Sequence, residues 1–193
     1  MYLTNNSLFK DLHLFIKTMQ ITDSQEFNTQ AGSIGTRHTL KNENSKNELK
    51  NILIKLCNVT ISPLEGKKLA IKVDDEATLN VLNQFEEKLS NFLISHFNTS
   101  NECISPVVYT SDSGNNTVYV RLNNYSSFYD VTGEDYELEN RRVIGDCIIK
   151  FDTVTYVNGK YYVNGSLYQC LVKDVAPNSK ILLNFDSEFM NNF

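Results

Sequence analysis

Apolar residues recur every three to four positions along residues 76–97, and at every second position along much of the chain after residue 49. The first spacing predicts an amphipathic helix that packs on a sheet, and core packing is favoured over a role in binding a partner. Asp74 and Asp75 precede this helix and offer N-terminal caps with favourable charge. The apolar stripe contains Leu79, Leu82, Phe85, Leu89, Phe92 and Leu93.

The second spacing predicts strands at residues 49–61, 67–73, 107–110, 117–122, 146–157 and 161–175. Asn158-Gly159 joins the last two strands as a hairpin, because positive φ costs little at these two residue types. Gly165 predicts a bulge or bend in the returning strand. Residues 62–66 read as a turn, and residues 111–116 as a hairpin loop.

Two segments lack a clear period. Residues 1–46 begin with apolar positions that fit either a helical stripe or, at Leu12, Leu14 and Ile16, a strand. Residues 22–47 are polar and predict a loop or a mobile arm. Residues 123–140 form a long connection rich in acids and tyrosine, which is typical of functional or mobile loops. Its acids are expected to be solvated, or to form a flap that competes with a polyanion for a basic groove.

The elements together define a mainly β (α+β) class. One helix inserted among five to seven strands fits an antiparallel, closed sheet, and the oligonucleotide-binding (OB) barrel is the best match among common folds. We therefore expect an N-terminal extension at residues 1–46, an OB-like nucleic-acid-binding domain at residues 47–176, and a C-terminal segment or tail at residues 177–193.

Composition restricts the function. A net charge of −5 argues against a uniformly basic, duplex-coating surface, although a local basic groove remains compatible with it. The four cysteines form no CxxC motif, which favours free thiols in a reducing compartment. No long apolar run or signal peptide is read, so the expected location is intracellular, in host cytoplasm or nucleus if the source is viral.

No motif predicts catalysis. The histidines at positions 13, 38 and 96 are isolated, and no P-loop, GxSxG or HExxH is present. We therefore predict no enzyme activity, no catalytic residue, no metal and no cofactor.

Aromatic and basic residues alternate with apolar ones on the predicted strands. Single-stranded nucleic acid binds to such mixtures, because bases stack on aromatic rings and cations follow the phosphates. The competing explanation is that tyrosine is common on strands through β-propensity alone. The candidate nucleic-acid-binding residues are Lys68, Lys72, Tyr119, Arg121, Lys150, Tyr156, Lys160 and Tyr162.

The order of elements resembles the OB-fold single-stranded DNA-binding proteins of large DNA viruses and virus-like elements. The resemblance covers residues 49–175 and includes a last hairpin that begins GDCIIKF at residues 145–151 and returns to Val172-Lys173. It implies sequence-independent binding that protects exposed strands during viral or plasmid-type DNA replication. The chain departs from this family in having no tryptophan and a net acidic charge.

The C-terminal sequence NFDSEFMNNF is similar to the acidic, phenylalanine-terminated tails of bacterial and phage single-strand binders. That similarity implies a partner-binding tail, with Asp186, Glu188 and Phe193 recruiting replication proteins. Two alternatives stay open: a viral structural or assembly protein that uses the sheet surface for protein contacts, and an accessory subunit that binds a partner through residues 123–140. Homo-oligomerisation also stays open.

Overall fold

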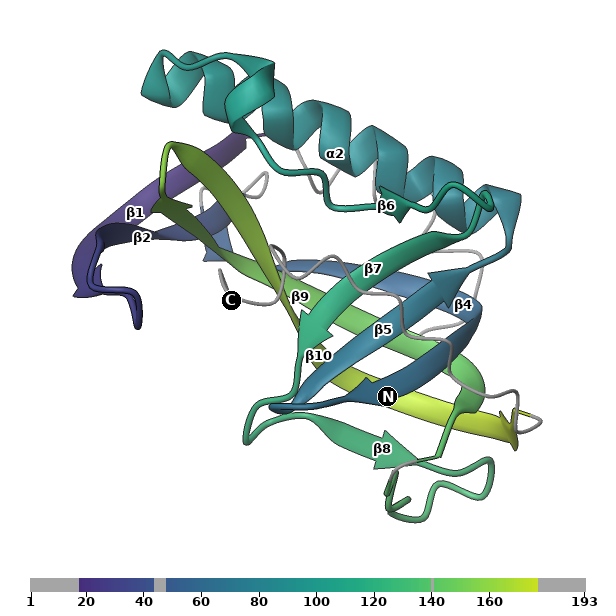
Figure 1. Cartoon of the computed structure of the whole chain (residues 1–193). Helices are drawn as coiled ribbons and strands as arrows, with labels where there is room; N and C mark the ends of the chain where they lie inside the picture. The colour runs from purple at the N-terminus through teal and green to yellow at the C-terminus, as the bar shows by residue number, and fades with distance from the viewer. Residues whose placement is uncertain (1–17, 44–47, 140, 177–193) are drawn as a thin grey trace.

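The structure is a computed structural model that describes residues 18–43, 48–139 and 141–176. It contains a ten-stranded sheet and one long helix, α2 (Figure 1). The elements in chain order are β1 (Thr18–Asn28), β2 (Ile34–Glu43), β3 (Leu49–Lys50), β4 (Ile52–Leu64), β5 (Lys68–Val73), α2 (Glu76–Phe97), a 3-10 turn (Asn101–Cys103), β6 (Tyr109–Thr110), β7 (Asn116–Arg121), β8 (Ser127–Tyr129), β9 (Val143–Val157) and β10 (Lys160–Val175).

Five of these strands close into a ring. The order around it is β4-β5-β7-β10-β9 and back to β4, so the strands follow the chain except that the fifth lies between the third and the fourth. All pairs are antiparallel except β7 with β10, which are parallel and pair at only two positions, Val120 with Gly165 and Arg121 with Ser166. The OB-like barrel that the sequence predicted is confirmed, with this one parallel contact as a refinement.

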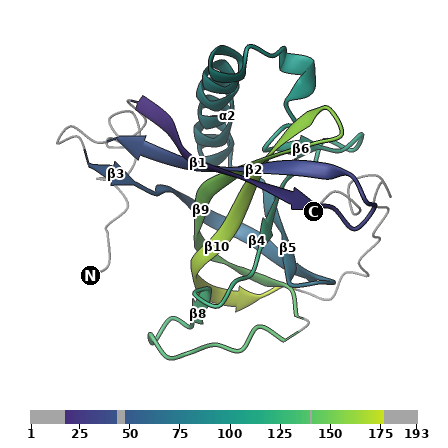
Figure 2. The same ribbon diagram turned by 90° about the vertical axis from the view of Figure 1, so that its left-hand side faces the viewer.

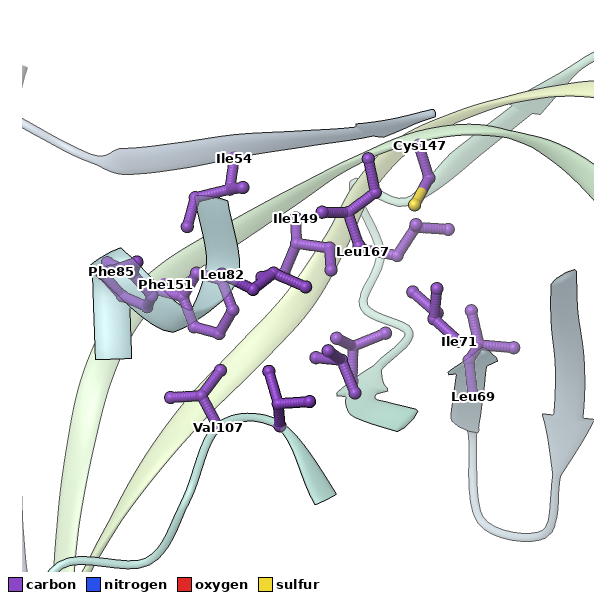
Figure 3. Close-up of a cluster of buried hydrophobic side chains, with 14 of the residues drawn as sticks. Ile54, Leu69, Ile71, Leu82, Phe85, Val107, Cys147, Ile149, Phe151 and Leu167 are labelled. Atoms are coloured by element: carbon purple, nitrogen blue, oxygen red, sulfur yellow. The ribbon is translucent and has the colours of Figure 1, made fainter. Parts of the chain in front are cut away.

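The helix covers one end of the ring (Figure 1). It begins after Asp75, whose carboxylate accepts a hydrogen bond from the backbone N–H of Thr78 at 2.7 Å. Its bounds are those predicted from the apolar spacing. Phe85 is fully buried and packs on Phe151 of β9, with ring centroids 4.8 Å apart (Figure 3). The predicted stripe is therefore a core face.

The long hairpin also matches its prediction. Asn158 and Gly159 both have positive φ, as a tight two-residue turn requires. The register shifts at Asn164/Gly165, so Gly165 marks a bulge. Gly145, at the start of β9, lies so close to β10 that a Cβ there would stand 2.3 Å from the carbonyl oxygen of Leu171. Only glycine fits this approach without a backbone shift.

The predicted loop or arm at residues 22–47 is wrong over most of its length. β1 and β2 form an antiparallel hairpin, and β2 pairs with the far half of β9 at residues 153–156 (Figure 2). β9 is long enough for one half to pair with β4 in the ring and the other half with β2. The inward positions of β2 include the polar His38 and Asn42, which hide its alternation. The division of the chain at residue 46 stays a prediction.

Two predicted connections are shorter than expected. β4 extends through Leu64, so residues 62–64 of the predicted 62–66 turn belong to a strand. Within residues 123–140, β8 pairs in parallel with β10.

Among the described residues, no helix is long and apolar enough to cross a membrane.

Candidate nucleic-acid interface

Four of the predicted binding residues lie on the outer surface of β5 and β7. Lys68 stands opposite Arg121, and the next outward pairs are Ala70 with Tyr119 and Lys72 with Thr117. The alternate residues of both strands are buried in the ring. We call the outer surface of these two strands, with Lys68, Lys72, Tyr119 and Arg121, the β5–β7 face.

Cations repel one another along this face. Burial, and then the charge of Arg121, lower the pKa of Lys68. Burial, and then the charge of Arg37, lower the pKa of Arg121. Lys68 is the register partner of Arg121, and Arg121 and Arg37 line the same groove. These three cations on β5, β7 and β2 are therefore neighbours, and we call them the basic row. Such repulsion is relieved when an anion such as a phosphate binds.

An aromatic pair stands beside the basic row. Tyr119 contacts Tyr109 of β6 edge to face, with ring centroids 5.5 Å apart. The segment before β6 is held by Glu86 of α2, whose carboxylate accepts hydrogen bonds from the N–H groups of Val107 and Val108 at 2.6 and 2.9 Å. Burial raises the pKa of both tyrosines above the ordinary phenol value, so the two phenols, already neutral near pH 7, also stay neutral in more alkaline solution. A neutral, half-buried ring fixed in this way suits stacking on a base.

Two of the predicted lysines are engaged in ion pairs. Lys72 lies 2.9 Å from Asp74. Lys150 lies 2.5 Å from Asp152, and it reaches the same part of the sheet as Arg121, since both stand next to Ser166 in register. Lys72 belongs to the β5–β7 face and Lys150 lies next to it, but each has an acid that competes with a phosphate.

The remaining three predicted residues occupy the tip of the β9–β10 hairpin and do not form one surface. Tyr156 pairs with Tyr161 in register, on the side opposite Thr155, and the two tilted rings are in contact with centroids 4.6 Å apart. Lys160 is exposed at the turn. Tyr162 is only 8% exposed, so it is a packed residue and not an open platform for stacking.

A groove opens between the β1–β2 hairpin, the β9–β10 hairpin and the end of β7. Its volume is about 440 Å³, and Arg37 and Arg121 both line it. Asp152 is the single acid among the described lining residues, and it is bound to Lys150. The other lining groups include Phe27, Thr155 and several asparagine and threonine side chains. The groove is therefore polar, net positive and continuous with the β5–β7 face through Arg121.

Arg37 and Phe27 were missed by sequence reasoning because they lie in the segment read as a loop. The guanidinium carbon of Arg37 stands 5.2 Å from the centroid of the Phe27 ring. The signal in the sequence is a pair of Thr- and Ile-containing runs on either side of Gly32, which has positive φ in the turn.

Other predicted features add nothing to the groove. Of the described residues in the 123–140 connection, Asn123 lines the groove and none of the acids does, so these acids are not placed as a flap over it. Within the described ranges, no three His, Cys, Asp or Glu side chains gather in a way that could hold a metal ion. The tail residues Asp186, Glu188 and Phe193 lie outside the described residues.

Comparisons with known proteins identify the fold. No protein-family model matches the chain, and no curated protein matches it in sequence. Solved structures of the single-stranded DNA-binding protein from bacteriophage Enc34 are similar to it. One has a TM-score of 0.52 at 11% identity and covers 77% of this chain and 93% of that one. A second, titled as a complex with single-stranded DNA, has a TM-score of 0.50 at 11% identity, covering 71% and 92%.

The chain thus shares the fold of this bacteriophage Enc34 protein. This confirms the fold that the order of elements implied. At this level of identity the likeness concerns the backbone, so the binding residues have to be argued from the face and groove of this chain.

Proposed function

We propose that this protein binds single-stranded DNA with little sequence preference and protects exposed strands during viral or plasmid-type DNA replication. The proposed activity is binding without catalysis, because stacking and phosphate contact are what the interface chemistry supports. Phosphates would follow the basic row, and bases would stack on Tyr119.

The observation that carries the proposal is the basic row. The chain is acidic overall, with 23 acids against 18 lysines and arginines. Lys68, Arg121 and Arg37 nevertheless gather on one side. Burial, and then the charge of Arg121, lower the pKa of Lys68, and burial, and then the charge of Arg37, lower the pKa of Arg121. A polyanion is the ligand that stabilises such an arrangement. In OB barrels generally, the face of the second and third strands binds oligonucleotides, and here these strands are β5 and β7.

The tail and the assembly state extend the proposal. We propose that Asp186, Glu188 and Phe193 recruit replication proteins, as the resemblance of the C-terminal sequence implies. Self-association on the strand is compatible with this role, and sedimentation of the protein with and without DNA would measure it.

The deciding experiment is fluorescence anisotropy with labelled oligo-dT of about 30 nucleotides at two salt concentrations, with a duplex of the same length as competitor. We expect single-strand binding that weakens with salt and resists the duplex. The absence of tryptophan permits a second readout, since tyrosine fluorescence can be followed directly and should be quenched on stacking. No binding at low salt and micromolar protein would overturn the proposal and favour a structural or assembly role for the sheet surface.

One substitution is expected to strengthen binding. Asp152→Asn removes the single acid among the described groove residues and releases Lys150 from its ion pair. We expect the dissociation constant for oligo-dT to fall about threefold to tenfold at low salt, because one more cation faces the phosphates. Asp174→Asn, at an exposed residue near the far end of β10, gives the same charge change as a control. Equal affinities for the two variants would contradict the expectation.

A further inference from the structure

The groove beside the β1–β2 hairpin is a second candidate binding site, next to the β5–β7 face. It lies between an added hairpin and the long β9–β10 hairpin, beyond the point where Arg121 ends β7. Its volume of about 440 Å³ is within the range of roughly 300–1,000 Å³ that small-ligand sites occupy.

Arg37 lines this groove from β2, and its exposed side chain contacts an aromatic ring. Its guanidinium lies over the Phe27 ring at 5.2 Å, which is cation–π distance. Phe27 in turn lies across Gly35, where a Cβ would meet the ring at 2.6 Å. Glycine at position 35 therefore leaves the space that the ring occupies, and the ring positions the arginine.

The polar lining supplies groups of the kind that contact a base edge. Asn164 donates a hydrogen bond from its amide nitrogen to the hydroxyl of Thr155 at 2.7 Å, and both residues line the groove. Thr155 is the register partner of Arg37, so the amide, the hydroxyl and the guanidinium occupy neighbouring positions. Amide and hydroxyl groups both donate and accept hydrogen bonds, which suits any of the four bases.

We propose that this groove binds one nucleotide of the strand, with its phosphate between Arg37 and Arg121 and its base against the Asn164–Thr155 wall. The β1–β2 hairpin is then part of the binding surface, and the bound DNA strand extends beyond the β5–β7 face onto this hairpin. This inference rests on the proposed single-strand binding and adds the residues by which the hairpin takes part.

The test compares Arg37→Ala with Arg141→Ala in the full chain. Both variants lose one arginine charge, but Arg141 is exposed, paired with Glu139 and not among the groove residues. Affinity for oligo-dT of about 30 nucleotides is measured over a salt series, and thermal melts verify the fold. We expect Arg37→Ala to bind about tenfold more weakly and to lower the salt slope by about 0.7, as for one lost phosphate contact on a single strand. Arg141→Ala should match the wild type.

Photo-crosslinking with 4-thiothymidine oligonucleotides, followed by peptide mass spectrometry, gives an independent readout. Crosslinks in residues 27–37 together with those in β5 and β7 would support the groove. Crosslinks confined to β5 and β7, with an unchanged salt slope for Arg37→Ala, would overturn it and leave the proposed function intact. If the wild type binds no oligonucleotide, the proposed function itself fails and the groove assignment fails with it.

Discussion

Replacing Lys68 by Gln, Tyr119 by Leu and Arg121 by Gln together is expected to weaken oligo-dT binding by about two orders of magnitude or more at roughly 0.1 M salt. One lost stack accounts for roughly 1–3 kcal/mol, and each 1.4 kcal/mol is a factor of ten. The two lost cations should also make the salt slope shallower by about 1.4, at roughly 0.7 per phosphate. Anisotropy over a salt series measures both quantities.

The matched control for this variant changes the same residue types elsewhere. Lys50→Gln, Tyr168→Leu and Arg141→Gln alter exposed residues that belong neither to the β5–β7 face nor to the groove. We expect its affinity to remain close to that of the wild type. If the first variant keeps its fold by circular dichroism and still binds as the wild type does, the β5–β7 face is ordinary strand surface and its tyrosine reflects β-propensity.

The second large effect concerns stability. Phe85→Ala removes a fully buried ring that joins α2 to Phe151 of β9. We expect the free energy of unfolding to fall by about 3–5 kcal/mol, because the helix and the ring of strands cannot collapse fully into the space left behind. Urea unfolding followed by circular dichroism measures this loss. Total stabilities of about 5–15 kcal/mol are usual, so the variant would lose a large share.

Glu87→Ala is the control on the same helix, since Glu87 is exposed. Its change should stay within about 0.5 kcal/mol. A loss below about 1 kcal/mol for Phe85→Ala would mean that α2 contributes little to closing this end of the core, contrary to the packing described here.

Sequence periodicity located the elements whose inward residues are apolar. The helix, its Asp75 cap, the Asn158-Gly159 turn and the Gly165 bulge follow from local rules of spacing and φ, and each is found where the sequence places it. These features depend on neighbours close in the chain, so a single sequence contains their signal.

The β1–β2 hairpin escaped prediction for a physical reason. Two of its inward positions are occupied by His38 and Asn42, which are polar and nevertheless only 8% and 3% exposed. His38 is satisfied by the Ser24 hydroxyl at 2.8 Å, and burial, with His96 nearby, lowers its pKa. β2 is stabilised by this polar contact and by pairing with the far half of β9, which is more than a hundred residues away in the chain. Its sequence therefore shows no apolar alternation.

The candidate site could be predicted only where local strand alternation places its residues. Strand alternation placed Lys68 with Lys72, and Tyr119 with Arg121, on one side of their strands. The pairing of β5 with β7 joins these two sides into one face. Arg37 could not be added, since its position beside Arg121 depends on β2 pairing with β9. Tyr162 was assigned to the surface by alternation alone, whereas both Tyr161 and Tyr162 are buried, so alternation does not hold at this end of β10.

The parallel contact between β7 and β10 bears on how DNA binding would stabilise the closed ring of strands. The ring closes there through two paired positions, and one of them is Arg121 itself. A DNA strand bound by Arg121 and by groove residues on β9 and β10 would lie across the contact between β7 and β10 and would stabilise it. Ligand that binds only the closed ring raises stability with the logarithm of its concentration. Protein bound to exposed DNA would therefore survive heat and proteases longer than protein waiting in solution.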